Sequence, residues 1–222
     1  MIKCLIFDLD DTLYYEKTYV LGAFKEVCIY LSQKYCVEFE VLYKRCAEIL
    51  DEYGRGRIFN ILCDEFNFKE DIPYLVEVYR KSRTKLELYK ESNEIIEFAK
   101  KNNLYLGIIT DGCSQVQWNK IKSLGLEKKI DKIIVTDDYG QGYGKPHNKS
   151  YSEMISYFNV KPYECMYIGD NPKKDFLGAK KLGMKTIRVI YEQGDHIYDK
   201  ASNEYEADYI IKSLLDIKTM IG

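Results

Sequence analysis

The stretch FDLDDTL, residues 7–13, ends a short and largely apolar run and places three acids within four positions. Side chains alternate between the two faces of a strand, so Asp8 and Asp10 are predicted to point the same way. Two like charges held side by side repel each other. Either these acids belong to a simple turn, or they bind a divalent cation or pair a nucleophile with an acid. The stretch alone leaves both interpretations open.

Other short apolar runs in the chain, closed by Gly or Asp, are typical of buried parallel strands. The predicted strands are 3–9, 104–110, 132–136, 165–169 and 184–190. Helical patterns lie between them at 92–102, 114–124, 150–158 and 175–182. This alternation predicts an α/β fold with a doubly wound, mostly parallel sheet.

Residues 16–86 interrupt the alternation, because they contain no convincing strand. Their amphipathic patterns predict helices at 18–35, 40–53, 57–66 and 72–86. We therefore expect an all-helical insertion at 16–86, acting as a cap, and an α/β core formed by 1–15 and 87–222. No repeat or flexible linker separates the two parts.

The composition excludes several classes of protein. Among 222 residues, 33 Lys and Arg nearly balance 35 Asp and Glu, which indicates neither a nucleic-acid nor a membrane partner. No apolar stretch approaches the ~20 residues that cross a bilayer. The seven cysteines are odd in number and form no C-x-x-C pair, which favours reduced thiols and a cytoplasmic location.

Polar residues follow the predicted strands at their carboxyl ends, where open parallel sheets bind ligands. They comprise Asp8 and Asp10, Thr110-Asp111-Gly112, Gly144-Lys145-Pro146, and the segment from Asp170 to Asp175. Each group alone is a weak signal, because acids and Gly-Lys-Pro turns are common in loops. Together, in this order and at one edge of the sheet, they predict a single site.

Four segments carry a family resemblance: FDLDDT, IITDG, GKPH and IGDNPKKD. They resemble the four motifs of the haloacid dehalogenase-like (HAD) hydrolase superfamily, in the subclass whose helical cap follows the first strand. The likeness covers nearly the whole chain and implies a Rossmann-like core. It also implies a Mg²⁺-dependent phosphatase that acts on a small phosphorylated metabolite, but it says little about which one.

The resemblance assigns roles to the acids. Asp8 and Asp170, with the backbone carbonyl of Asp10, would hold Mg²⁺, which prefers hard oxygen ligands. The second Asp8 oxygen would attack phosphorus and form an aspartyl-phosphate. The Asp10 carboxyl would protonate the leaving oxygen and then deprotonate the water that hydrolyses the intermediate.

Charge on the transferring phosphoryl group requires fixed donors. The family pattern gives this task to the Thr110 hydroxyl, the backbone around Asp111 and the Lys145 ammonium. Asp175 would orient Lys145 or support the metal ligands.

Outside the motifs, Arg55 and Arg57 lie in a glycine-containing break between two predicted helices. One hypothesis is that either contacts an anionic or polyhydroxylated leaving group; a charged inter-helix turn is the alternative. Lys173 and Lys174 are predicted to form a solvated face.

Other functions remain open at this point. A phosphomutase or phosphotransferase would keep every residue named above. In a different class, a phospho-accepting regulatory module would use similar groups without turnover, although such modules are about half this length. The sequence does not choose among nucleoside monophosphates, sugar phosphates and acyl-sugar phosphates, nor between a monomer and a dimer.

Overall fold

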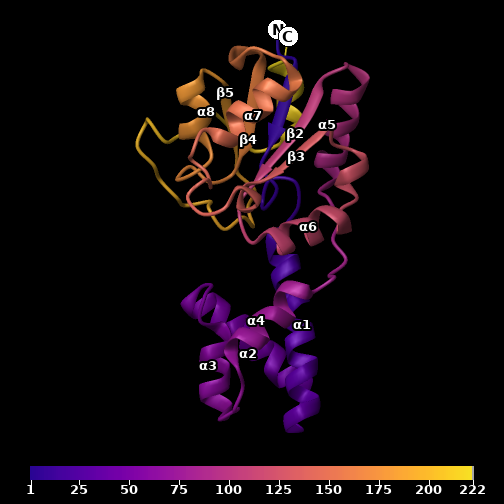
Figure 1. The fold of residues 1–222 in the computed structure, drawn as a ribbon, viewed down its shortest axis with the longest axis vertical. Coiled ribbons are helices and arrows are strands. Elements are labelled where there is room, and N and C mark those ends of the chain that lie inside the picture. The colour runs from indigo at the N-terminus through magenta and orange to yellow at the C-terminus, as the bar shows by residue number, and fades with distance from the viewer. Residues whose placement is uncertain (222) are drawn as a thin grey trace. The chain divides into compact units, whose positions relative to one another are not determined.

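The computed structural model describes residues 1–221, and the chain divides into two compact units (Figure 1). The α/β unit comprises Met1–Glu16 and the chain from Leu86 onward, and the helical unit comprises Lys17–Lys85. Among the described residues, no helix combines the length and the apolar character that crossing a membrane requires.

The α/β unit is built on a six-stranded parallel sheet in the order β3-β2-β1-β4-β5-β6. The strands are β1 Cys4–Phe7, β2 Tyr105–Thr110, β3 Lys132–Val135, β4 Cys165–Gly169, β5 Lys185–Val189 and β6 Tyr209–Ile211. The predicted doubly wound α/β fold is confirmed. The edge strand β6 was not predicted, because it is three residues long and only its last residue is buried.

Four helices connect and cover the sheet: α5 Lys90–Lys101, α6 Ser114–Ser123, α7 Lys149–Phe158 and α8 Phe176–Leu182. The chain runs outward from β1 to β3 and then returns to β4 and β5 on the other side of β1. Right-handed connections therefore place α5 and α6 on one face of the sheet and α7 and α8 on the other (Figure 1). The direction reverses between β1 and β4, which is where such sheets bind ligands.

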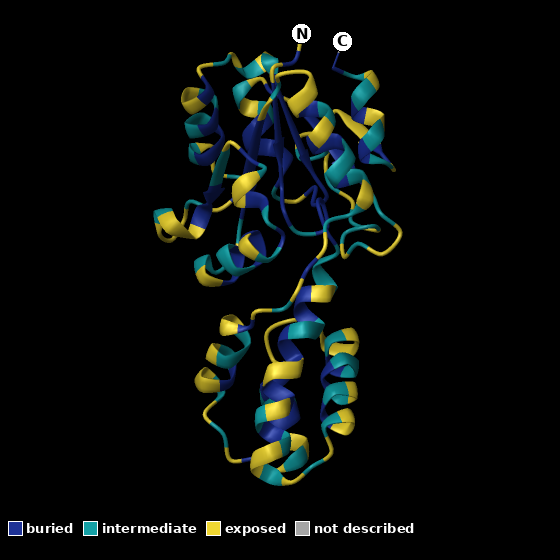
Figure 2. Cartoon of the chain, turned by 90° about the vertical axis from the view of Figure 1, so that its right-hand side faces the viewer, coloured by how far each residue is buried: buried dark blue, intermediate teal, exposed yellow. Residues whose placement is uncertain are grey.

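Short 3₁₀ helices complete this unit at Leu126–Lys128, Thr136–Tyr139, Pro162–Glu164 and Leu214–Thr219. The central strands β1 and β4 are fully buried between the helices (Figure 2). On the α7/α8 face, Ile6, Ile109 and Tyr167 of the sheet pack with Met154 and Phe176 of the helices. This apolar layer fixes the strand ends from which the polar side chains project.

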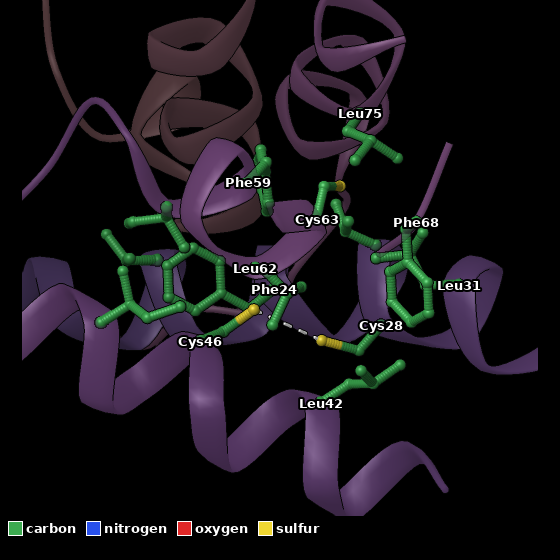
Figure 3. Packing of buried hydrophobic residues seen from close by; sticks show 14 residues of the cluster. Phe24, Cys28, Leu31, Leu42, Cys46, Phe59, Leu62, Cys63, Phe68 and Leu75 are labelled. Atoms are coloured by element: carbon green, nitrogen blue, oxygen red, sulfur yellow. Dashed lines mark hydrogen bonds between the residues drawn. The ribbon is translucent and has the colours of Figure 1, made fainter. Parts of the chain in front are cut away.

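The helical unit has its own core between α1 Glu16–Tyr35, α2 Phe39–Tyr53, α3 Ile58–Phe66 and α4 Ile72–Lys81. Figure 3 shows this core, in which Phe24 and Leu31 lie among Leu62 and Phe68. All four helices lie in the segment predicted to be helical.

The predicted helix 72–86 ends early, at Lys81. The Ser82 and Thr84 hydroxyls hydrogen-bond each other at 2.9 Å, a local bond that competes with helical backbone bonding. Ser82 itself is extended, with ψ 138°. The segment then packs so closely on α1 at Gly22 that a β-carbon there would overlap Thr84. A non-helical segment therefore leads back to the α/β unit.

Helix α8 approaches the turn before α7 closely at Gly178, which gives a first prediction. A β-carbon there would lie 2.5 Å from the Pro146 carbonyl oxygen and 2.7 Å from the Tyr151 ring. Overpacking costs about 1–3 kcal/mol, and alanine returns up to about 1 kcal/mol in helix propensity. We expect Gly178→Ala to lower the free energy of unfolding by about 1–2 kcal/mol in urea titrations. Lys181→Ala, at an exposed position of the same helix, should change it by less than about 0.5 kcal/mol. A Gly178→Ala protein as stable as the wild type would show that this approach is not tight.

Candidate active site

Asp8 directly follows β1, beside the point where the strand order reverses. Its side chain is almost fully buried, and its Oδ1 accepts a hydrogen bond of 2.5 Å from the Lys145 ammonium. Burial raises the pKa of Asp8 to about 7, although the Lys145 charge lowers it. Within residues 1–221, no donor reaches Oδ2. One oxygen of Asp8 is therefore fixed by a cation, and the other is uncommitted.

Lys145 is held at both its backbone and its ammonium. The Nζ donates to Asp8 at 2.5 Å, to Asp175 at 2.7 Å and to the Tyr167 hydroxyl at 3.2 Å, and the side chain is completely buried. Its backbone N–H donates to the Asp111 carboxylate at 3.1 Å. Burial opposes the positive charge, but Asp175 and Asp8 hold the pKa of Lys145 well above its ordinary value. Lys145 is therefore a fixed, charged donor.

Asp175 supports Lys145 and the loop after β4. Its carboxylate also accepts the Asn171 backbone N–H at 2.9 Å, and its carbonyl accepts the Tyr151 hydroxyl at 2.8 Å. Although it precedes α8, its side chain makes no capping hydrogen bond to that helix. Burial would raise the pKa of Asp175, but the Lys145 charge keeps it below its ordinary value. A β-carbon at Gly169 would lie 2.5 Å from this carboxylate, so glycine is required there.

Asp170 completes a group of carboxylates suited to a divalent cation. Oxygens of Asp8, Asp170 and Asp175 lie within 4.8 Å of one another. Asp175 is occupied by Lys145, whereas no described donor reaches the buried Asp170 carboxylate. Burial, followed by the charges of Asp175 and Asp8, raises the pKa of Asp170 well above its ordinary value. A buried carboxylate without a donor beside a second carboxylate fits the hard oxygen ligands that Mg²⁺ prefers.

Asp10 has a different set of partners. Its Oδ1 accepts the Tyr14 hydroxyl at 2.6 Å, and its Oδ2 accepts the Gln117 amide at 3.0 Å. The Lys120 ammonium lies 2.7 and 2.9 Å from the two oxygens and donates to Glu16 at 2.9 Å. Sequence reasoning did not single out Gln117 or Lys120. Their i, i+3 spacing, which places both on one side of the helix after IITDG, was the available signal.

Thr110 and Asp111 lie at the end of β2. The Thr110 hydroxyl accepts the Gln117 amide at 2.5 Å and is buried. The Asp111 carboxylate accepts the Thr136 hydroxyl at 2.7 Å and the Lys145 backbone N–H. The Asp111 side chain therefore anchors the Lys145 turn, and only its backbone N–H could contact a phosphate.

Asp11, the third acid of FDLDDTL, has a structural task. Its φ is 50°, and its carboxylate accepts the backbone N–H groups of Glu16 at 2.9 Å and Asp195 at 3.2 Å. A short polar side chain tolerates this left-handed conformation. The three crowded acids thus have different partners: Asp8 binds Lys145, Asp10 binds Lys120, and Asp11 accepts backbone N–H groups that stabilise a turn.

The two lysines before Asp175 differ from each other. Lys173 is exposed and pairs with Asp199 at 3.0 Å, as a solvated residue would. Lys174 is partly buried, and its charge lowers the pKa values of Asp8 and Asp170. Within the described chain its ammonium forms no ion pair. The prediction of a solvated face was therefore wrong for Lys174, because the turn directs it toward the acids.

The two arginines that the sequence singled out, Arg55 and Arg57, also differ in their surroundings. Arg55 lines a cavity of about 270 Å³ together with Arg80 and apolar residues of α1, α3 and α4. Arg57 is exposed and immediately precedes α3. Arg55 therefore borders a space that could hold part of a ligand.

The crowding of Asp8 and Asp170 predicts how Mg²⁺ affects stability. A cation bound only by the folded protein stabilises it, by about 2.7 kcal/mol at 100 times its Kd. We expect MgCl₂ to raise the Tm of the wild type in thermal-shift measurements. Asp170→Asn should raise the Tm without Mg²⁺, because it removes a buried like charge, and should lose most of the Mg²⁺ effect.

Asp64→Asn is the matched control, since Asp64 is exposed in the helical unit. It should keep the full Mg²⁺ effect. A Mg²⁺ effect on Asp170→Asn equal to that on the wild type would remove Asp170 from the metal site.

Several known proteins resemble this chain over nearly its whole length. A family model described as "Haloacid dehalogenase-like hydrolase" matches residues 5–189. The chain is 31% identical over 222 residues to "Glyceraldehyde 3-phosphate phosphatase" of Pyrococcus furiosus, covering 96% of this chain and 90% of that protein. It is 30% identical over 228 residues to the protein of the same name from Methanocaldococcus jannaschii, covering 100% and 97%. Among solved structures, "HAD phosphatase from Thermococcus onnurineus" matches with TM-score 0.66 and 27% identity, covering 100% and 98%.

Proposed function

Because the chain belongs to the haloacid dehalogenase-like hydrolases, we propose that it is a Mg²⁺-dependent phosphatase that hydrolyses a small phosphomonoester through an aspartyl-phosphate on Asp8. The two relatives described above are named as phosphatases, and the enzyme is a hydrolase of phosphoric monoesters. The observation that carries the proposal is the state of Asp8. One of its oxygens is bound by Lys145, and the other is uncommitted beside Asp170.

The metal would be held by Asp8 and Asp170, with the backbone carbonyl of Asp10 as a further ligand. When bound, Mg²⁺ supplies positive charge that allows a phosphate dianion to approach a carboxylate. The uncommitted oxygen of Asp8 forms a bond to phosphorus while the bond between phosphorus and the leaving oxygen breaks. Lys145 keeps the Asp8 carboxylate oriented throughout, because its own position is fixed by Asp175 and Tyr167.

Asp10 is proposed to move the protons of the reaction. It gives a proton to the leaving oxygen as the aspartyl-phosphate forms, and the leaving group departs as an alcohol. It then takes a proton from the water that attacks the intermediate, which releases phosphate and restores the Asp8 carboxylate. The Thr110 hydroxyl, the Asp111 backbone N–H and Lys145 are the proposed donors to the phosphoryl oxygens.

The substrate is proposed to be a small sugar phosphate or a related metabolite. The relatives named as glyceraldehyde 3-phosphate phosphatases make a triose phosphate the first compound to test. Arg55 or Arg57 remains the proposed contact for the leaving group in the helical unit, and of the two Arg55 lines a cavity. All seven cysteines are free thiols, which supports the reducing compartment that we propose for the enzyme.

The nucleophile is tested by Asp8→Asn. We expect phosphate release from p-nitrophenyl phosphate and glyceraldehyde 3-phosphate to depend on Mg²⁺ and to fall about a thousandfold or more in this variant. Quenched wild-type reactions should show a phosphate adduct on the peptide that contains Asp8, by mass spectrometry. Asp64→Asn should retain wild-type rates. Equal phosphate release by Asp8→Asn and the wild type would end the proposal.

The positive charge of the partly buried Lys174 is expected to favour the binding of an anion at the site and to oppose the binding of a cation. At an effective dielectric constant near 20, a unit charge contributes on the order of 1–4 kcal/mol at separations of roughly 4–15 Å. We expect Lys174→Met to weaken inhibition by inorganic phosphate on the order of tenfold and to tighten Mg²⁺ binding, measured by calorimetry.

Lys173→Met is the matched control from the same turn, and both constants should stay within about twofold of the wild type. A general distortion of the site by Lys174→Met would instead weaken the binding of both ions. That result would contradict the electrostatic role of Lys174.

A further inference from the structure

The Asp10 carboxylate is surrounded by donors from its own turn and from α6. Gln117 and Lys120 are one helical turn apart, and both are nearly fully buried, although glutamine and lysine are usually exposed in helices. Together with the Tyr14 hydroxyl, they occupy both oxygens of Asp10.

The free-energy cost of burying the Lys120 ammonium makes this residue a poor source of fold stability. Taking an ammonium out of water costs several kcal/mol, and paired buried charges often stabilise less than apolar residues of the same volume. The charges of Asp10 and Glu16 hold the pKa of Lys120 above its ordinary value, although burial lowers it. Fold stability alone therefore gives no reason for a lysine here, whereas fixing the position of Asp10 does.

Gln117 connects the acid to the proposed phosphate contact. Its amide donates to Asp10 at 3.0 Å and to the Thr110 hydroxyl at 2.5 Å. A single side chain thus sets the distance between a group proposed to contact the phosphoryl oxygens and a group proposed to protonate the leaving oxygen. Proton transfer to a leaving group requires this kind of alignment.

We propose that Lys120, together with Gln117, is a positioning residue that holds the Asp10 carboxyl for proton transfer to the leaving oxygen. This inference rests on the proposed phosphatase function. The proton passes from Asp10 to the oxygen whose bond to phosphorus breaks, and Asp10 is left as a carboxylate. Lys120 and Gln117 contact that carboxylate without exchanging a proton with the substrate.

A comparison of leaving groups separates this role from general support of the fold. Nitrophenolate leaves without needing a proton, whereas an alkoxide does not, so only alkyl phosphates depend strongly on a positioned acid. The experiment measures kcat/KM of Lys120→Met for p-nitrophenyl phosphate and for an alkyl phosphate that the wild type hydrolyses. We expect a loss on the order of a hundredfold for the alkyl phosphate and of less than about threefold for the aryl phosphate. Lys122→Met, an exposed lysine on the same helix, should leave both values unchanged.

A double-mutant cycle tests whether Lys120 acts through Asp10. Asp10→Asn should show the same selective loss on the alkyl phosphate, and adding Lys120→Met to it should cost little more. If Lys120→Met does not fold, Lys120→Gln keeps a neutral donor, and Gln117→Met removes the second contact. Each should lower the alkyl-to-aryl ratio of kcat/KM in the same direction.

The outcomes distinguish this inference from the proposed function. A wild-type enzyme that hydrolyses both substrates, with Lys120 variants that lose activity equally on both or add fully to Asp10→Asn, would overturn the positioning role alone. A wild-type protein that releases no phosphate from any phosphomonoester with Mg²⁺ would overturn the proposed function itself.

Discussion

The buried ion pair between Lys145 and the carboxylates of Asp8 and Asp175 is the interaction on which the α/β unit depends. Three acids, including Asp170, place oxygens within 4.8 Å of one another, and their repulsion is strong in a site shielded from water. One ammonium fixes two of these acids and leaves Asp170 without a donor. Lys145 thus offsets only part of the repulsion among the three carboxylates. A divalent cation would neutralise the negative charge that remains.

The parallel sheet brings this pair together from distant parts of the chain. Asp8 follows β1 and Asp170 follows β4, the two strands between which the winding direction reverses. Lys145 lies in the connection between β3 and β4, and the Asp111 carboxylate after β2 binds its backbone N–H. Each motif is weak as a local signal, because its meaning comes from a sheet edge that only the assembled topology creates.

The sequence therefore predicted the sheet and the acids of the motifs better than the residues around them. Alternating apolar runs and helical patterns were sufficient for the core strands, but edge strand β6 is too short and too exposed to give such a pattern. Lys120 and Gln117 were not singled out, because a polar residue in a helix is usually solvated and only tertiary contacts bury these two. Lys174 was misjudged for the same reason. Predictions of exposure from residue type rest on the average surroundings of that type, and functional sites depart from that average.

Asp8 and Asp10, which are separated by one residue, show how neighbouring side chains can give two aspartates different proposed roles. Asp8 and Asp10 have the same side chain and follow the same strand, yet different cations reach them. Lys145 binds one oxygen of Asp8, so the other can attack an electrophile. Lys120 contacts both oxygens of Asp10, alongside Tyr14 and Gln117, so neither oxygen is as free as Oδ2 of Asp8 to form a bond to phosphorus. The proposed nucleophile and the proposed acid thus differ in the lysine that contacts them, which lies in the loop before α7 for Asp8 and in α6 for Asp10. The crowding of acids in FDLDDTL follows from placing both at the end of one strand.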